Sequence, residues 1–125
     1  MSTYSLPKEQ RLTGRTAIDS LFAKGAGGFV YPLRYVVLAD RLAVPGVSVL
    51  FVVPKRAHKR AIRRNLLKRR MREAYRTQSG PLKEVAEDKN IKVNIALLYS
   101  AKEVEDYRKI ADAVGKILTQ VAERV

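Results

Sequence analysis

Apolar residues recur along this chain with two different periods, and each period predicts a different kind of element. Residues 91–99 alternate as expected of a strand, with Lys92 and Asn94 on one side and five residues on the apolar side: Ile91, Val93, Ile95, Leu97 and Tyr99. Residues 47–53 are almost continuously apolar, which is typical of a central strand covered on both faces. Residues 33–39 are rich in β-branched and aromatic side chains and predict a third strand.

Helical spacing dominates near both ends of the chain. A group of four apolar residues predicts a helix over residues 14–24, capped by Thr13 and ended by Gly25: Ala17, Ile18, Leu21 and Phe22. A longer stripe predicts a last helix, for which residues 100–103 form a capping box: Val104, Tyr107, Ala111, Val114, Ile117, Leu118 and Val121. Pro81 opens a short helical turn to about residue 87. We interpret the glycine-rich residues 25–28 as a flexible linker.

A single domain over residues 1–125 accounts for this pattern, since no internal repeat or domain boundary interrupts it. With a basic helix between the second and third strands, the predicted order is α-β-β-α-β-α. The predicted fold class is therefore α+β, with helices packed on a small mixed sheet.

The charge of the chain is concentrated in one stretch, residues 55–76. This stretch holds 11 of the 25 Lys and Arg residues and a single acid, Glu73, so it carries +10 of the net charge of +13. Charges packed this densely repel one another unless an anion lies against them. The stretch therefore predicts a surface that binds a polyanion.

Helical spacing gives this stretch two distinct faces. One face is apolar and suited to burial: Leu67, Met71, Ala74 and Tyr75. Another face carries a row of polar and cationic side chains: Asn65, Lys68, Arg69, Arg72 and Arg76. Ile62 and Leu66 form a weaker apolar strip beside that row. No Gly or Pro interrupts the stretch, which favours a shaped basic helix over an unstructured basic tail.

The sequence argues against several kinds of chemistry. It contains no cysteine, so disulfides and thiolate metal sites are excluded and a reducing cytoplasm is favoured. The only histidine, His58, lies among cations, where we expect a surface position or an RNA contact rather than a metal ligand. The 12 acids form no recognisable pair at catalytic spacing, so we expect neither a catalytic residue nor a metal site. The first residues lack the apolar segment of a secretory signal, and no apolar run is long enough to span a membrane.

A motif inside the basic stretch points to a known family. The motif reads Arg64-Asn65-x-x-Lys68-Arg69-x-x-Arg72-Glu73 and follows Val53-Pro54-Lys55-Arg56 at a strand end. It resembles the signature of the bacterial ribonuclease P protein subunit, an Arg-Asn-Arg triplet followed by Lys-Arg and Arg-Glu on one helix. Leu66 stands where the triplet has its second Arg, and Arg69 and Arg70 are the candidates to supply that charge. Chain length, element order and Arg11-Leu12 before the first helix also agree with the family.

The resemblance implies a function and a set of partners. In that family the RNA subunit is the ribozyme, and it hydrolyses precursor tRNA to release the 5′ leader with bound Mg²⁺. This chain is then expected to be the non-catalytic protein subunit of a cytoplasmic endoribonuclease, binding ribonuclease P RNA and precursor tRNA. No membrane, small-molecule substrate or cofactor of the protein alone is implied. The family also implies a left-handed crossover around the basic helix, where general rules favour a right-handed one.

The resemblance assigns residues as well. We expect the ribozyme-facing row to contain Arg64, Asn65, Lys68, Arg69 and Arg72, followed in rank by Lys55, Arg56, Lys59 and Arg60. Arg76 of the helical row is a further expected RNA contact. In the family, a cleft between the first helix and the sheet holds the single-stranded leader, where aromatic rings stack on bases. By position, the candidates for that cleft are Ile18, Phe22 and Tyr35. Core packing is an equal alternative for Phe22, and Tyr107 is expected in the core.

Two other classes of function fit the same charge. A structural RNA-binding protein, such as a ribosomal protein, could show this fold class, and dependence of tRNA 5′ maturation on the chain would separate the two. A membrane-surface binder could use a basic amphipathic helix, but it needs large exposed apolar residues opposite the cations. Liposome flotation tests that alternative.

Overall fold

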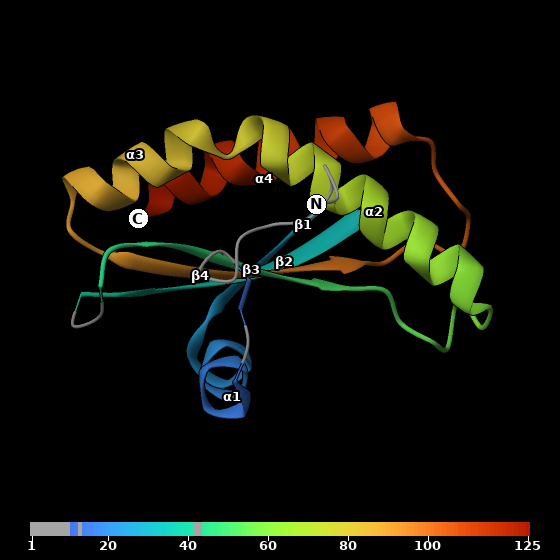
Figure 1. Cartoon of the computed structure of the whole chain (residues 1–125), viewed down its shortest axis with the longest axis horizontal. Coiled ribbons are helices and arrows are strands. Elements are labelled where there is room, and N and C mark those ends of the chain that lie inside the picture. Colours follow the sequence, from blue (N-terminus) through green and yellow to red (C-terminus); the bar gives the residue numbers. More distant parts are fainter. Residues whose placement is uncertain (1–10, 13, 42–43) are drawn as a thin grey trace, which may run out of the picture.

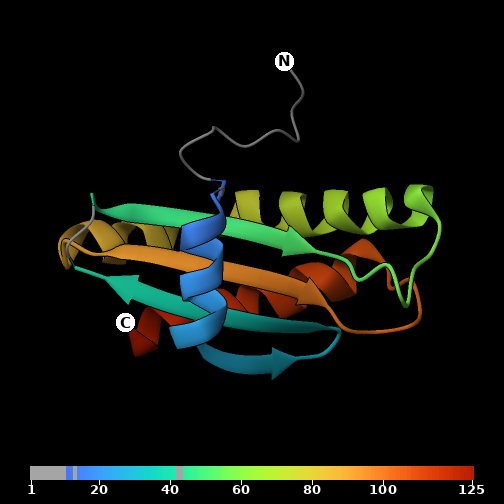
Figure 2. The ribbon, with the colours of Figure 1, turned by 90° about the horizontal axis from the view of Figure 1, so that it is seen from below.

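Four strands form one mixed sheet in the computed structural model, which describes residues 11–12, 14–41 and 44–125. The strands are β1 (Ala26–Val30), β2 (Leu33–Asp40), β3 (Gly46–Val52) and β4 (Lys92–Tyr99), in the spatial order β1-β2-β4-β3. β2 runs antiparallel to β1 and β4, whereas β3 and β4 are parallel. β4, the last strand in sequence, therefore lies inside the sheet (Figure 2).

Helices cover both faces of this sheet (Figure 1). α1 (Arg15–Lys24) crosses one face, while α2 (Ala61–Gln78), α3 (Gly80–Asp88) and α4 (Tyr107–Arg124) form a layer on the other. The predicted α+β class and the α-β-β-α-β-α order are confirmed. β1 and a full helix α3 are added to that order.

The connection from β3 to β4 has an unusual hand. The two strands are parallel neighbours, joined by α2 and α3. In Figure 2 α1 lies in front of the sheet, and the chain leaves β3 and returns behind the sheet through α2 and α3. It then enters β4, which lies between β3 and β2. This path is a left-handed crossover, as the resemblance implied, and it departs from the general right-handed rule.

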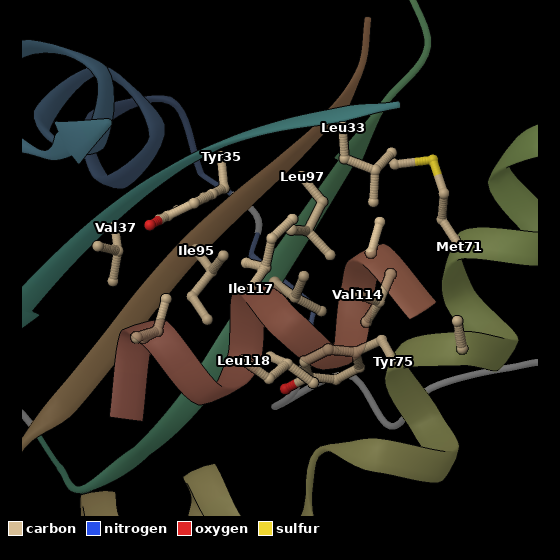
Figure 3. Packing of buried hydrophobic residues seen from close by; sticks show 14 of the residues in the cluster. Leu33, Tyr35, Val37, Met71, Tyr75, Ile95, Leu97, Val114, Ile117 and Leu118 are labelled. Atoms are coloured by element: carbon tan, nitrogen blue, oxygen red, sulfur yellow. The ribbon is translucent and has the colours of Figure 1, made fainter. Parts of the chain in front are cut away.

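The main core lies between the sheet and the layer of α2, α3 and α4. Figure 3 shows strand and helix side chains meeting there: Leu33, Tyr35 and Val37 of β2, Ile95 and Leu97 of β4, Met71 and Tyr75 of α2, and Val114, Ile117 and Leu118 of α4. A smaller cluster on the other face packs under α1: Leu12, Leu21 and Ala96, with Ile18, Val36, Leu38, Leu50 and Leu98 half-buried beside them. β4 is thus buried on both faces, which explains its apolar sequence.

The chain reaches α1 along the outer edge of β3. Arg11 forms a parallel bridge with Val49, and the Leu12 N–H donates to the Val49 carbonyl at 2.9 Å. Gly14 is the N-cap of α1. The predicted Thr13 cap lies outside the described residues.

The interpretation of residues 25–28 as a flexible linker is wrong. These residues lead into β1, which pairs with β2 from Ala26 to Val30. The glycine at position 28 serves close packing, because a Cβ there would overlap the Tyr35 ring. Glycine therefore lets β1 approach β2 over an aromatic side chain.

The predicted start of the last helix is also wrong. α4 begins at Tyr107, and the Asp106 carboxylate caps it by accepting the Lys109 N–H at 2.9 Å. The Tyr99 hydroxyl bonds the backbone of the residues just before α4 and so keeps them out of the helix. It donates to the Glu103 carbonyl at 2.5 Å and accepts the Glu105 N–H at 2.9 Å. Tyr107 is 38% exposed, so its predicted core position is wrong.

Candidate nucleic-acid interface

α2 has a buried apolar face and a solvent-facing side that carries cations. Its apolar face is fully buried in the main core: Leu67, Met71, Ala74 and Tyr75. Asn65, Arg69 and Arg76 are exposed, whereas Lys68 and Arg72 are half-buried on the flank of the helix. The structure thus brings all five members of the predicted row onto the solvent side of one rigid helix.

Electrostatic pairing distinguishes the two ends of this row. Arg76 forms an ion pair with Glu73 at 2.5 Å. The hydrogen bond from Arg76 lowers the pKa of the Glu73 carboxyl, so this pair stays ionised. Within the described part of the chain, Lys68 and Arg72 have no carboxylate within ion-pair distance. The attraction for an anion is therefore strongest before the last turn of the helix.

A turn precedes α2 and carries four more cations. Residues 54–60 form this turn instead of the predicted first turns of the helix, and the His58 N–H donates to the Pro54 carbonyl at 3.2 Å. The cations of the turn are exposed: Lys55, Arg56, Lys59 and Arg60. Arg64 is half-buried, and its Nη1 donates to the carbonyls of His58 and Lys59 at 3.0 and 2.7 Å. Arg64 therefore joins the turn to the helix.

His58 is not on the surface, and that prediction is wrong. The side chain is fully buried, with its Nε2 2.7 Å from the Ala101 carbonyl oxygen. Its ring packs edge to face against Tyr99, with centroids 5.3 Å apart. The residue lies among cations in the sequence, but its ring is held inside the fold by a hydrogen bond and an aromatic neighbour.

The candidates for the leader cleft do not share one face. Phe22 is 45% exposed on α1, and Ile18 is half-buried in the cluster beneath that helix. Tyr35 points to the opposite side of the sheet, where it is buried and its hydroxyl donates to Gln120 Oε1 at 2.8 Å. Its assignment beside α1 is therefore wrong, because strand alternation directs residue 35 toward α4.

Two residues that the sequence prediction missed lie on the α1 side of the sheet. Phe29 of β1 pairs with Arg34 of β2, which in turn pairs with Leu98 of β4. Directly paired residues point to the same face, and Leu98 belongs to the cluster under α1. Phe29 is 57% exposed. The alternation of β2 could have revealed Arg34, whereas Phe29 was hidden by the interpretation of its neighbours as a linker.

The described part of the chain contains neither a cluster of metal-ligating side chains nor a membrane-spanning helix. Among residues 11–12, 14–41 and 44–125, no three His, Cys, Asp or Glu side chains lie close enough to hold a metal ion. No helix in the same residues is both long and apolar enough to cross a membrane.

Comparison with known proteins decides the family. The family model described as Ribonuclease P matches residues 6–122, which is nearly the whole chain. This chain belongs to the ribonuclease P protein family. The sequence resemblance is confirmed, and the comparisons support it over the ribosomal alternative.

Named relatives in this family cover most of the chain. The ribonuclease P protein component of Porphyromonas gingivalis strain W83 is 36% identical over 124 residues, covering 98% of this chain and 90% of its own. The component of Chlorobaculum tepidum is 36% identical over 111 residues, covering 80% of this chain and 70% of its own.

Solved structures of ribonuclease P proteins share the fold. The protein from Thermotoga maritima has a TM-score of 0.71 at 20% identity, covering 88% of this chain and 96% of its own. A mutant protein from Staphylococcus aureus has a TM-score of 0.72 at 15% identity, covering 93% and 90%. At these identities the likeness concerns the fold.

One position departs from the ribonuclease P motif, and the structure shows what surrounds it. Leu66, in place of the second Arg of the triplet, is half-buried on α2. Of the two arginines that could supply the charge, Arg70 donates from Nη1 to the Glu105 carbonyl at 2.5 Å, on the side of the loop before α4. Arg69 is exposed within the row, so it is the better placed of the two.

Proposed function

We propose that this chain binds ribonuclease P RNA and precursor tRNA in the cytoplasm and promotes endonucleolytic removal of the tRNA 5′ leader. The RNA carries the catalysis in this proposal. The observation that supports it most is the row of cations on the solvent side of α2, whose apolar face is buried in the core of a ribonuclease P family member.

The row and the turn before it form the surface for the catalytic RNA. Cations fixed on a rigid helix neutralise phosphates and release counterions, so they bind RNA without reading its sequence. Such contacts suit a subunit that serves every precursor tRNA. The contacting residues are Lys55, Arg56, Lys59, Arg60, Arg64, Asn65, Lys68, Arg69, Arg72 and Arg76.

Magnesium belongs with the RNA in this proposal. A magnesium site needs several oxygen ligands that converge in near-octahedral geometry. The carboxylates of the described residues do not converge in this way. We therefore assign no metal-dependent step to the protein, whose cations act by reducing the repulsion between two RNA molecules.

Reconstitution tests the function. The chain is mixed with ribonuclease P RNA from the same organism and a precursor tRNA at low magnesium. We expect RNA and protein together to release the leader, whereas RNA alone needs high magnesium to screen phosphate repulsion. Protein alone should leave the substrate intact. Cleavage by RNA-free protein, or no effect of the protein at any magnesium concentration, would contradict the proposal.

The leader contact has its own test. Phe22 and Phe29 expose aromatic rings from α1 and β1, and the paired Arg34 lies beside Phe29. We expect Phe29→Ala to weaken binding of precursor tRNA by about 1–3 kcal/mol, the value of one base stack, and to spare mature tRNA. Fluorescence anisotropy with both RNAs measures this difference.

A matched control for Phe29 is available on the other layer. Tyr107 is an exposed aromatic residue at the start of α4, so Tyr107→Ala should change neither affinity. Equal losses for precursor and mature tRNA in Phe29→Ala would remove this residue from the leader contact.

A further inference from the structure

His58 connects two loops at one end of the sheet. Its backbone belongs to the turn of residues 54–60, which joins β3 to α2. Its Nε2 lies 2.7 Å from the carbonyl oxygen of Ala101, in the loop that joins β4 to α4. Because β3 and β4 are parallel neighbours, these two loops leave the sheet at the same end.

The hydrogen bond defines the tautomer of His58. The Ala101 carbonyl only accepts, so Nε2 must carry the proton. Nδ1 is buried and has no hydrogen-bond partner among the described residues. The imidazole is therefore fully removed from solvent and makes one hydrogen bond, which links the two loops.

The loop that receives this bond is itself held in place. The Ser100 N–H donates to the Pro32 carbonyl at 2.8 Å. The Tyr99 hydroxyl bonds the backbone of Glu103 and Glu105, and its ring contacts the imidazole edge to face. The hydrogen bond of His58 therefore links the basic turn to a loop that is itself hydrogen-bonded to its neighbours.

Arg64 fastens the same turn from the other side. Its Nη1 donates to the carbonyls of His58 and Lys59 at 3.0 and 2.7 Å. The turn is thus bonded at its centre to α2 and to the β4–α4 loop. Four cationic side chains of this turn are exposed to solvent: Lys55, Arg56, Lys59 and Arg60.

We propose that His58 is a positioning residue that holds these four cations in place before RNA arrives. The inference rests on the proposed function and adds a role for a residue that does not touch RNA. Four like charges on one short turn repel each other, so an unanchored turn would be extended and variable. Ordering such a turn at the moment of binding lowers affinity, and a preformed turn avoids that loss.

Two substitutions separate positioning from packing. His58→Phe keeps an aromatic ring against Tyr99 but removes the donor to Ala101. His58→Gln places an amide N–H near the position of Nε2 and restores the donor. Binding to ribonuclease P RNA is measured over a range of salt concentrations, at temperatures where circular dichroism shows each variant to be folded.

We expect His58→Phe to bind RNA about tenfold more weakly with an unchanged salt slope, because all four cations are still present. His58→Gln should recover most of that loss. As a control, Lys59→Ala should lower the salt slope by about one unit, because a phosphate contact is removed. A slope that falls in His58→Phe, or a Gln variant as weak as the Phe variant, would overturn the positioning role.

The free protein provides a test that needs no variant. Backbone ¹⁵N relaxation should give residues 55–60 order parameters of about 0.85, typical of rigid backbone, in the absence of RNA. Values below about 0.6 would show that the turn is not preformed and would overturn the inference. Failure of the wild-type chain to bind the RNA at all would instead refute the proposed function, so the two failures are distinguishable.

Discussion

Replacing Lys68, Arg69 and Arg72 together with alanine is expected to weaken binding to ribonuclease P RNA by about a thousandfold at moderate salt. Each charge-assisted contact with a phosphate contributes about 1.5 kcal/mol, or about a factor of ten, and three are removed. The salt slope should fall by about two to three units, because each phosphate contact releases nearly one counterion. Native gel shifts over a salt series measure both quantities.

This variant should stay folded, since none of the three side chains is fully buried. The matched control removes three exposed cations from other elements: Lys24, Lys116 and Arg124. Both variants lose three positive charges, so a general charge effect would weaken them equally. A similar loss in both variants would show that the position of the cations on α2 is unimportant, contrary to our assignment.

The second large effect concerns the main core. Leu97 of β4 is fully buried between the sheet and the α2–α4 layer. Leu97→Ala is expected to lower the free energy of unfolding by about 2–5 kcal/mol, because the substitution removes buried methyl groups and leaves a cavity. That loss is a large fraction of the stability of a small domain, about 5–15 kcal/mol. Urea unfolding followed by circular dichroism measures it.

The next residue in the strand is the control for this prediction. Leu98 points to the opposite face and is half-buried beside α1. Leu98→Ala removes the same atoms from a partly hydrated site and should cost about 1–2 kcal/mol. Equal losses at both positions would mean that the two faces of β4 are equally protected from water, in conflict with the structure.

Elements with a strong periodic signal were predicted well from sequence. Residues 91–99 alternate, and β4 spans Lys92–Tyr99. The buried face of α2 contains the four residues that helical spacing placed there. These predictions succeeded because the side of a regular element that faces the main core leaves a period in the sequence.

The errors arose where tertiary packing overrides local pattern. β1 has glycine where it crosses the Tyr35 ring, and a glycine-rich run without a period looks like a loop. Tyr35 itself belongs to a correctly predicted strand, but alternation alone does not say which helix covers which face. His58 is buried by a hydrogen bond to a residue 43 positions away, and nothing local indicates such a partner.

In the candidate site too, residues with a local sequence signal could be predicted and residues placed by tertiary packing could not. Cations on α2 could be assigned from spacing and from the family motif, because both depend on local sequence. The residues on the α1 side of the sheet could not, because strand register alone places Phe29, Arg34 and Leu98 on one face. Arg64 is an intermediate case, since the motif located it but did not reveal that it bonds the preceding turn.

The central position of β4 has a consequence for how the molecule is made. A ribosome delivers the chain from its first residue, so β2 and β3 emerge well before the strand that joins them, residues 92–99. Until that strand arrives, the apolar side of α2 has no completed sheet to cover it. The basic helix of a nascent chain is therefore present without a fixed orientation. We therefore expect the cations of α2 to become ordered only after residues 92–99 have emerged and paired.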